Sequence, residues 1–219
     1  MNPDYLARKE RWARKMAGRE TIVPRSEDRL PPGQHLVHDF PVLDLGITPD
    51  PPVTGWKLHV SGEVDNPRSF TMDDLGGLPR FTDVCDFHCV TTWSQFDMKF
   101  SGVSFFTLAD IVRPRDSARF VLMRSHDEYT TSLPLEALLD DDVMIATHWN
   151  DHPLSAEHGG PARVLVPKRY AWKSPKWIRE LRFASEDQLG YWEQRGYSNT
   201  ADPFTNDRFA PTAKADPSI

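Results

Sequence analysis

The sequence predicts one domain of the mixed α+β class. Segments with the periodicity of strands and of short helices alternate along the chain, and the long regular helices of a doubly wound parallel sheet are absent from the pattern. Neither a G-x-G-x-x-G motif nor a P-loop occurs. With 219 residues, 39% of them hydrophobic, the chain supplies one sizeable core rather than two. We therefore expect mixed sheets joined by short helices.

The elements are predicted from periodicity, in chain order. Apolar and polar residues alternate from Trp56 to Val64, which is the period of a strand. Thr71 followed by Asp74 has the spacing of a capping box, and it predicts a short helix ending at Gly76-Gly77. Further strands are predicted at 119–124, 143–149, 162–167 and 177–183, and further helices at 104–112 and 134–139.

The two ends of the chain differ in composition from this central part. Residues 1–55 predict an N-terminal arm, with a short amphipathic helix in its first twenty residues, and then a proline-rich extended segment that packs on the core. The central domain is expected at 56–200, and a polar C-terminal tail at 201–219.

Charge and hydropathy exclude some partners. The net charge of −6 argues against nucleic acid, because phosphate backbones require a basic surface. The longest apolar runs, such as 143–146, are too short for a transmembrane segment, and no secretory leader pattern occurs. Only two cysteines are present, so no disulfide framework is expected. Together these features predict a cytoplasmic location with reduced thiols.

Cys89 is the first candidate for chemistry. Residues 86–94 bring a thiol, an imidazole, a carboxylate and hydroxyls into nine positions. Cys89 could ligate a metal cofactor, could be a nucleophile with a base such as His88 or His158, or could bind zinc with Cys85 and His88. A buried, inert cysteine is the alternative without function. Zinc fits poorly because no second cysteine pair exists.

A basic stretch from Pro161 to Arg182 is the second candidate. It holds seven Lys or Arg residues against one acid, Glu180. A Gly-Gly-Pro turn precedes Arg163, and Lys173-Ser174-Pro175-Lys176 follows, so backbone amides and cations could together cradle a phosphate. The alternative is a hairpin with a solvated basic face. Asp140-Asp141-Asp142 predicts only a solvated acidic loop, and we assign no metal site to it.

Three blocks in this order resemble one family, the sulfite oxidase-like molybdopterin oxidoreductases. The blocks are Cys-Val-x-x-Trp-Ser from Cys89, His-Gly-x-Pro-x-Arg-x-x-Val-Pro from His158, and Lys-Ser-x-Lys from Lys173. The resemblance covers residues 56–197. The Cys89 block looks most like the branch containing the catalytic subunit of bacterial methionine sulfoxide reductases. This resemblance implies a sulfite oxidase-type molybdopterin-binding fold and a molybdenum–molybdopterin cofactor.

The resemblance also implies roles for individual residues. Cys89 would be the protein ligand to molybdenum and the catalytic residue. The residues implied in binding the cofactor are His35, His38, Asp39, Cys89, Ser125, His158, Arg163, Ser174, Pro175 and Lys176. His158 and Arg163 would hold the pterin and its phosphate, and burial of that phosphate without paired cations would be costly.

Differences from the family pattern shape the expected reaction. No arginine occurs at 34–40, where similar sulfite oxidases carry one that binds the substrate anion. The resemblance therefore implies two-electron oxygen-atom transfer on a small sulfur- or nitrogen-oxo compound, with sulfite disfavoured. The sequence shows no haem domain and no twin-arginine leader, so we expect a separate electron-transfer partner, a haem or other redox protein. A binding module of the same fold without catalysis is the alternative from another class.

Overall fold

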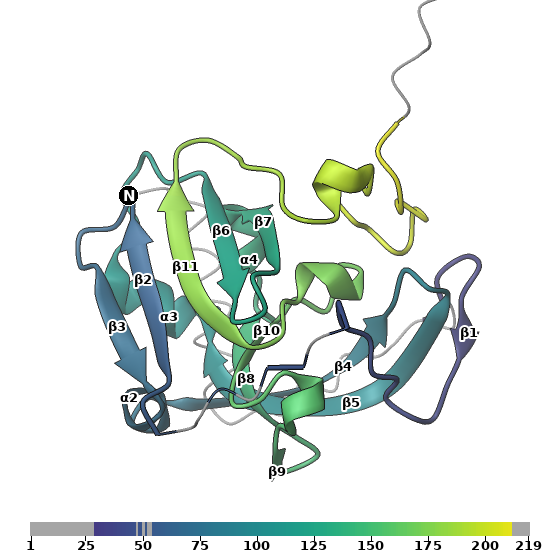
Figure 1. Ribbon diagram of the computed structural model, residues 1–219, viewed down its shortest axis with the longest axis horizontal. Helices are drawn as coiled ribbons and strands as arrows, with labels where there is room; N and C mark the ends of the chain where they lie inside the picture. Colours follow the sequence, from purple (N-terminus) through teal and green to yellow (C-terminus); the bar gives the residue numbers. More distant parts are fainter. Residues whose placement is uncertain (1–28, 47, 50, 52–53, 212–219) are drawn as a thin grey trace, which may run out of the picture.

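The computed structural model describes residues 29–46, 48–49, 51 and 54–211, and it contains two β-sheets (Figure 1). The first sheet consists of β1 (His35–Leu36), β4 (Arg80–His88), β5 (Trp93–Ser104), β8 (Met144–Trp149), β9 (His152–Pro153) and β10 (Arg163–Leu165). The second consists of β2 (Lys57–Gly62), β3 (Arg68–Thr71), β6 (Phe120–Ser125), β7 (Thr130–Pro134) and β11 (Ile178–Ala184). The strands β1 and β5 pair in parallel, as do β2 and β11, and the other pairs are antiparallel. The prediction of mixed sheets is confirmed.

The helices of the described residues are short. They are α2 (Met72–Gly76), α3 (Phe105–Val112), α4 (Leu135–Leu138) and the 3-10 turns η1 (Ala156–His158), η2 (Ala171–Lys173) and η3 (Glu193–Arg195). The capping box is confirmed, since the Thr71 side chain accepts a hydrogen bond from the amide of Asp74 while the Asp74 carboxylate accepts one of 2.8 Å from the amide of Thr71. No helix in the described ranges is long and apolar enough to cross a membrane. The amphipathic helix expected in the first twenty residues lies outside those ranges.

A hairpin that the periodicity did not predict is the longest feature of the first sheet. Strands β4 and β5 pair from Arg80↔Val103 to His88↔Ser94, with a register shift between Cys85 and Phe87. An irregularity of this kind breaks the alternation by which a strand is identified, and β4 also carries an exposed apolar residue, Val84, which is 44% exposed. The turn of this hairpin carries Cys89. Strands β3 and β7 were also not predicted.

The main hydrophobic core lies between the second sheet and α3. Five α3 residues that are at most 1% exposed pack there: Phe105, Phe106, Leu108, Ala109 and Val112. Burying each large side chain of this kind contributes about 1.5–3 kcal/mol. A second cluster, which includes Phe87, Cys89 and Trp93, lies on the first sheet. The turn that carries Cys89 thus belongs to a cluster of buried hydrophobic side chains.

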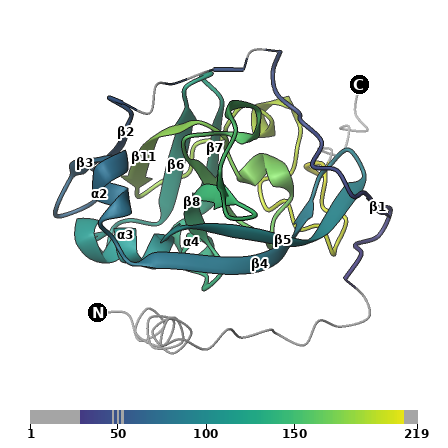
Figure 2. The same ribbon diagram turned by 90° about the horizontal axis from the view of Figure 1, so that it is seen from below.

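Described residues before β2 and after β11 lie against this domain. Figure 2 shows the chain between β1 and β2 crossing the side of the molecule opposite β4 and β5. Beyond residue 200, Ala201 is buried and its carbonyl accepts a hydrogen bond of 2.8 Å from the amide of Tyr170. The division of the chain at residues 55 and 200 stays a prediction.

Candidate active site

A cavity of about 260 Å³ brings together seven of the ten predicted site residues. They are Cys89 from the β4–β5 turn, Ser125 from the end of β6, His158 from η1, Arg163 from β10, and Ser174, Pro175 and Lys176 from the segment between η2 and β11. Residues far apart in the sequence, from Cys89 to Lys176, therefore line one cavity. Clefts lined by a few convergent polar groups are the usual place for ligands.

The Cys89 thiol lies in a buried turn. Its Sγ is 3.1 Å from the hydroxyl oxygen of Thr91, and the residue is 5% exposed. Burial raises the pKa of this thiol above its usual value, with the Thr91 hydrogen bond and the charge of Arg208 acting in the opposite direction. A thiolate here needs a positively charged partner such as a metal ion.

No histidine of the described residues hydrogen-bonds to this sulfur. The His88 Nδ1 lies 2.8 Å from the Ser94 hydroxyl, and burial lowers the pKa of His88 to about 4. The His158 ring lies 4.2 Å from the Phe40 ring, centroid to centroid. The cysteine–histidine arrangement of a nucleophile is therefore absent among these residues.

The zinc arrangement is also absent. The Cys85 Sγ lies 3.8 Å from the carbonyl of Met98, and the described residues bring no group of three ligand atoms together from Cys85, His88 and Cys89.

Arg163 is a buried cation at the cavity. It is 3% exposed and donates hydrogen bonds to the carbonyls of His158 (3.1 Å) and Ser174 (2.9 Å), but it makes no ion pair within the described chain. Its Nε has no hydrogen-bond partner among the described residues. Burial lowers the pKa of Arg163 to about 10. Its guanidinium also lies 5.3 Å from the centre of the Phe87 ring. A buried guanidinium with carbonyl and aromatic partners but no carboxylate favours binding of an anion.

Lys176 is the second cation of the cavity. Its Nζ donates a hydrogen bond of 2.9 Å to the carbonyl of Glu157 and lies 4.2 Å from the centre of the Trp177 ring. Burial lowers the pKa of Lys176 to about 8, and no described carboxylate pairs with it. Gly159 lies against it with a φ of +99°, and a Cβ there would come within 2.9 Å of the Lys176 Cβ. The Gly-Gly-Pro turn thus permits this close contact.

Further polar atoms at the cavity also lack partners. The Ser125 hydroxyl and the indole nitrogen of Trp172 are buried, and neither forms a hydrogen bond within the part of the chain that the structure describes, although both residues line the cavity. Buried polar groups of native proteins are nearly always satisfied by protein, water or ligand. Together with the Arg163 Nε, these atoms show that the cavity suits a ligand with several polar groups and negative charge. A thiol, two cations and hydroxyl and indole donors fit a pterin dithiolene phosphate.

The three predicted residues of the N-terminal segment do not line the cavity. His35, His38 and Asp39 are exposed, and β1 pairs His35 with Trp93 at the rim of the Cys89 turn. Their role in cofactor binding stays a prediction. The neighbouring Phe40 lines the cavity instead.

Aromatic residues of the cavity were not predicted. The lining includes Phe40, Phe87, Trp93, Tyr129, Trp172, Trp177, Trp192 and Tyr197. Aromatic side chains are common in cores, so the sequence offers no signal that separates these from the rest.

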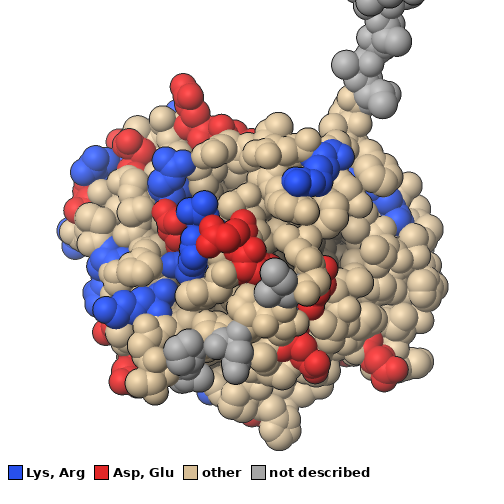
Figure 3. Space-filling model, viewed as in Figure 1, with Lys and Arg blue, Asp and Glu red and all other residues tan. Residues whose placement is uncertain are grey.

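The basic stretch from Pro161 to Arg182 divides between cavity and surface. Arg179 pairs with Glu128 at 2.7 Å and Arg182 donates to Gln188 at 3.0 Å, both on the outer face of β11, where Figure 3 shows basic and acidic side chains interspersed. Arg163 and Lys176 turn to the cavity. Part of the stretch is therefore a surface face, and the binding of a phosphate by the rest stays a prediction.

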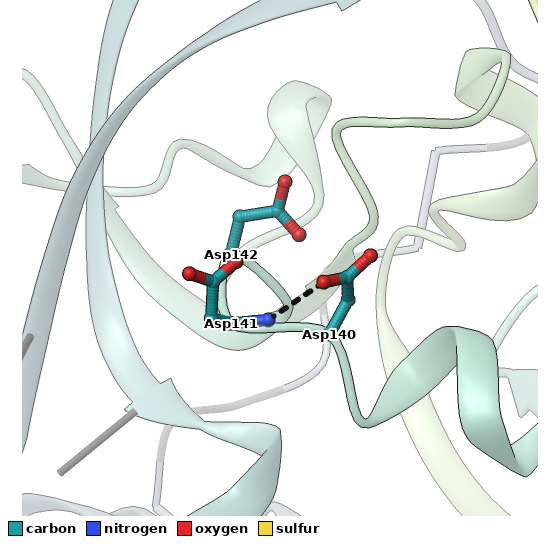
Figure 4. Close-up of side chains that lie close together, drawn as sticks. All are labelled: Asp140, Asp141 and Asp142. Atoms are coloured by element: carbon teal, nitrogen blue, oxygen red, sulfur yellow. Dashed lines mark hydrogen bonds between the residues drawn. The ribbon is translucent and has the colours of Figure 1, made fainter. Parts of the chain in front are cut away.

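The acidic loop at 140–142 is a separate cluster. Figure 4 shows the three carboxylates directed differently, with the amide of Asp141 bonded to Asp140. The Lys168 Nζ lies 2.9, 3.9 and 3.5 Å from the carboxylates of Asp140, Asp141 and Asp142. An ammonium group thus supplies the positive charge that a cation would bring.

Comparisons with known proteins give a consistent result. Residues 45–192 match a family described as "Oxidoreductase molybdopterin binding domain". The chain is 38% identical over 182 residues to an uncharacterized oxidoreductase, YuiH, of Bacillus subtilis, a match that covers 83% of this chain and 92% of that protein. It is 27% identical to the protein-methionine-sulfoxide reductase catalytic subunit MsrP of Campylobacter jejuni, over 63% of this chain and 52% of that protein.

A solved structure has a similar fold. The sulfane dehydrogenase SoxCD of Paracoccus pantotrophus superposes with a TM-score of 0.60 and 23% identity, over 68% of this chain and 42% of that chain. This chain therefore spans most of YuiH but about half or less of MsrP and SoxCD.

Proposed function

Since the chain belongs to the molybdopterin-binding oxidoreductase family, we propose that it catalyses oxygen-atom transfer on a small sulfur- or nitrogen-oxo compound, with the Cys89 thiolate as its ligand to molybdenum. The cofactor of this family is molybdenum–molybdopterin, and when bound it supplies the two-electron redox change. A substrate that loses an oxygen atom gains two electrons, and a substrate that gains one gives two up.

One observation carries the proposal. The Cys89 thiol opens on the same cavity as Arg163 and Lys176, two cations without a carboxylate partner among the described residues. Arg163 and Lys176 would hold the phosphate of the pterin through charge-assisted hydrogen bonds. Ser125 and Ser174 would contact the same group, and Cys89 would face the metal. Aromatic side chains form much of the remaining lining.

The charge of the cavity bears on the substrate. Its lining holds three carboxylates, of Asp44, Asp127 and Glu157, against the two cations. If Arg163 and Lys176 serve the phosphate, no lysine or arginine of the lining remains for an anionic substrate. A neutral oxo compound fits this balance better than sulfite or nitrate, and one curated relative is a protein-methionine-sulfoxide reductase subunit.

We also propose that electrons pass to or from a separate redox protein. The cytoplasmic location stays a prediction. The nucleophile alternative has no supporting contact, because Thr91 rather than an imidazole lies beside the Cys89 sulfur. Assays of metal content and turnover distinguish the enzyme from the alternative, a binding module without catalysis.

The experiment is a molybdenum and pterin assay on the purified chain, made in a host that synthesises the cofactor. We expect about one molybdenum per chain. Replacement of Cys89 by Ser should abolish turnover and alter the electron paramagnetic resonance (EPR) signal of the half-reduced metal, since a sulfur ligand is lost. Full activity without molybdenum would refute the proposal. Retained metal with no turnover on any sulfur- or nitrogen-oxo compound would favour the binding module.

A further inference from the structure

Two side chains hold the turn that carries Cys89, and both come from outside the part of the chain that matches the family. The Gln34 Nε2 donates a hydrogen bond of 3.1 Å to the carbonyl of Cys89, and the Arg208 Nη1 donates one of 2.6 Å to the carbonyl of Val90. The family match covers residues 45–192. These contacts join segments 55 and 118 residues apart in the sequence.

The turn needs such support because its backbone is strained. Thr92 has a φ of +77°, a region that β-branched residues rarely adopt and that costs about 1–3 kcal/mol. Inside the turn, the amide of Thr92 donates to the carbonyl of Cys89 at 3.1 Å and the amide of Cys89 donates to Trp93 at 2.9 Å. The amide of His35 also donates to the carbonyl of Thr92 at 2.9 Å. Strained turns persist where surrounding contacts fix them.

The orientation of Gln34 is set by a chain of buried hydrogen bonds. The Ser94 hydroxyl donates to the Gln34 Oε1 at 3.3 Å, and the His88 Nδ1 lies 2.8 Å from the same hydroxyl. Because the single hydroxyl proton of Ser94 goes to Gln34, the His88 Nδ1 must carry a proton and donate it to Ser94. Because the Gln34 Oε1 accepts from Ser94, the amide NH2 of Gln34 faces the carbonyl of Cys89. All three side chains are buried.

Arg208 is oriented from the other side. Its Nε donates to the Asn206 side chain at 2.7 Å, and its guanidinium lies 5.5 Å from the centre of the Tyr170 ring. A Cβ placed on Gly33 would lie 3.5 Å from the Arg208 Nη2, so the segments that carry Gln34 and Arg208 meet beside the turn.

From this geometry we infer that Gln34 and Arg208 are positioning residues that fix the Cys89 turn, so that the sulfur faces the cavity in one orientation. They touch the backbone of the turn and act on the reaction only through Cys89. This inference rests on the proposed function in one respect, namely that Cys89 is the metal ligand. We call Gln34 and Arg208 together the clamp. Its effect on the Cys89 turn can be tested without the cofactor.

The first test is hydrogen exchange on the full-length chain without cofactor. We expect Gln34→Met and Arg208→Ala each to speed exchange of the Cys89 and Thr92 amides by about fivefold, because one hydrogen bond is lost. Arg208→Lys keeps a charged donor and should restore most of the protection. Leu36→Ala and Arg115→Ala, at exposed positions, serve as matched controls. If either clamp variant unfolds, Gln34→Glu and Arg208→Gln replace it.

The second test is the EPR signal of the loaded protein. The clamp variants should give a broadened or multiple signal, because the sulfur samples several orientations, and Arg208→Lys should return it towards the wild type. Unchanged exchange and an unchanged signal in both clamp variants would overturn the clamp. An unchanged signal in Cys89→Ser would instead overturn the ligand role, and the exchange result would then stand by itself.

Discussion

The guanidinium of Arg163 donates a hydrogen bond of 2.9 Å to the backbone carbonyl of Ser174, and no carboxylate of the described residues neutralises it. The full positive charge of Arg163 therefore lies unpaired by any described carboxylate in a buried part of the cavity. Such a charge is costly unless an anion binds there.

Replacing Arg163 by Met should lower the cofactor content of the purified protein at least about tenfold, since charge-assisted hydrogen bonds to a phosphate contribute about 1.5–3 kcal/mol each. The measurement is molybdenum and pterin per chain, with circular dichroism to show that the variant is folded. Arg115→Ala removes an exposed arginine paired with Asp65 and should leave the content unchanged. Equal loss in both variants would contradict a specific role.

Lys176 should give the cofactor-free chain a distinct pH dependence. Its pKa is about 8 in the folded chain against 10.5 for an ordinary lysine. Between these values the unfolded chain binds more protons, so stability should rise with pH. Lys176→Met should therefore be more stable than the wild type at pH 7, and the difference should shrink towards pH 10. Urea unfolding at both pH values measures it, and a difference independent of pH would refute the burial of this cation.

The buried pair of Lys173 and Glu193 should be costly to break. Both side chains are fully buried, and Lys173 also donates to the carbonyl of Ser132 at 3.0 Å. Lys173→Met or Glu193→Leu alone should lower the free energy of unfolding by about 3–5 kcal/mol, because one buried charge remains unpaired. The double variant should lose much less. A double-mutant cycle of urea unfolding measures the coupling, and additive losses would contradict it.

Asp142 should destabilise the folded chain at neutral pH. Burial raises its pKa to about 6 from 3.8, although Lys168 lies within 3.5 Å. Because the folded chain holds this proton more tightly, stability is lost as the pH rises from 3.8 to 6. Asp142→Asn should therefore be more stable at pH 7, by at most about 3 kcal/mol, and equal to the wild type below pH 4.

Calcium should not raise the melting temperature of the chain, because the Lys168 ammonium group already lies among the carboxylates of Asp140, Asp141 and Asp142. Thermal unfolding with and without calcium measures this, and stabilisation by calcium would indicate a cation site.

Local structure was predictable where local pattern decides it. The predicted strand that becomes β2 and the helix capped by Thr71 are present, because alternation and the capping box act within a few residues. The β4–β5 hairpin was not predicted, since the register shift between Cys85 and Phe87 breaks the alternation. The hydrogen bonds of Gln34 and Arg208 to the Cys89 turn span 55 and 118 residues and leave no local pattern.

The sequence by itself determined the residue types of the candidate site: a cysteine, a glycine-rich turn and a basic stretch in the order typical of one family. It could not determine which cations are buried. Arg163 and Arg179 are equally basic in the sequence, but the fold buries the first against carbonyls and pairs the second with Glu128. The free energy of a charge depends on the atoms around it, and those atoms come from distant parts of the chain. Only the tertiary structure therefore decided which charges face the cavity.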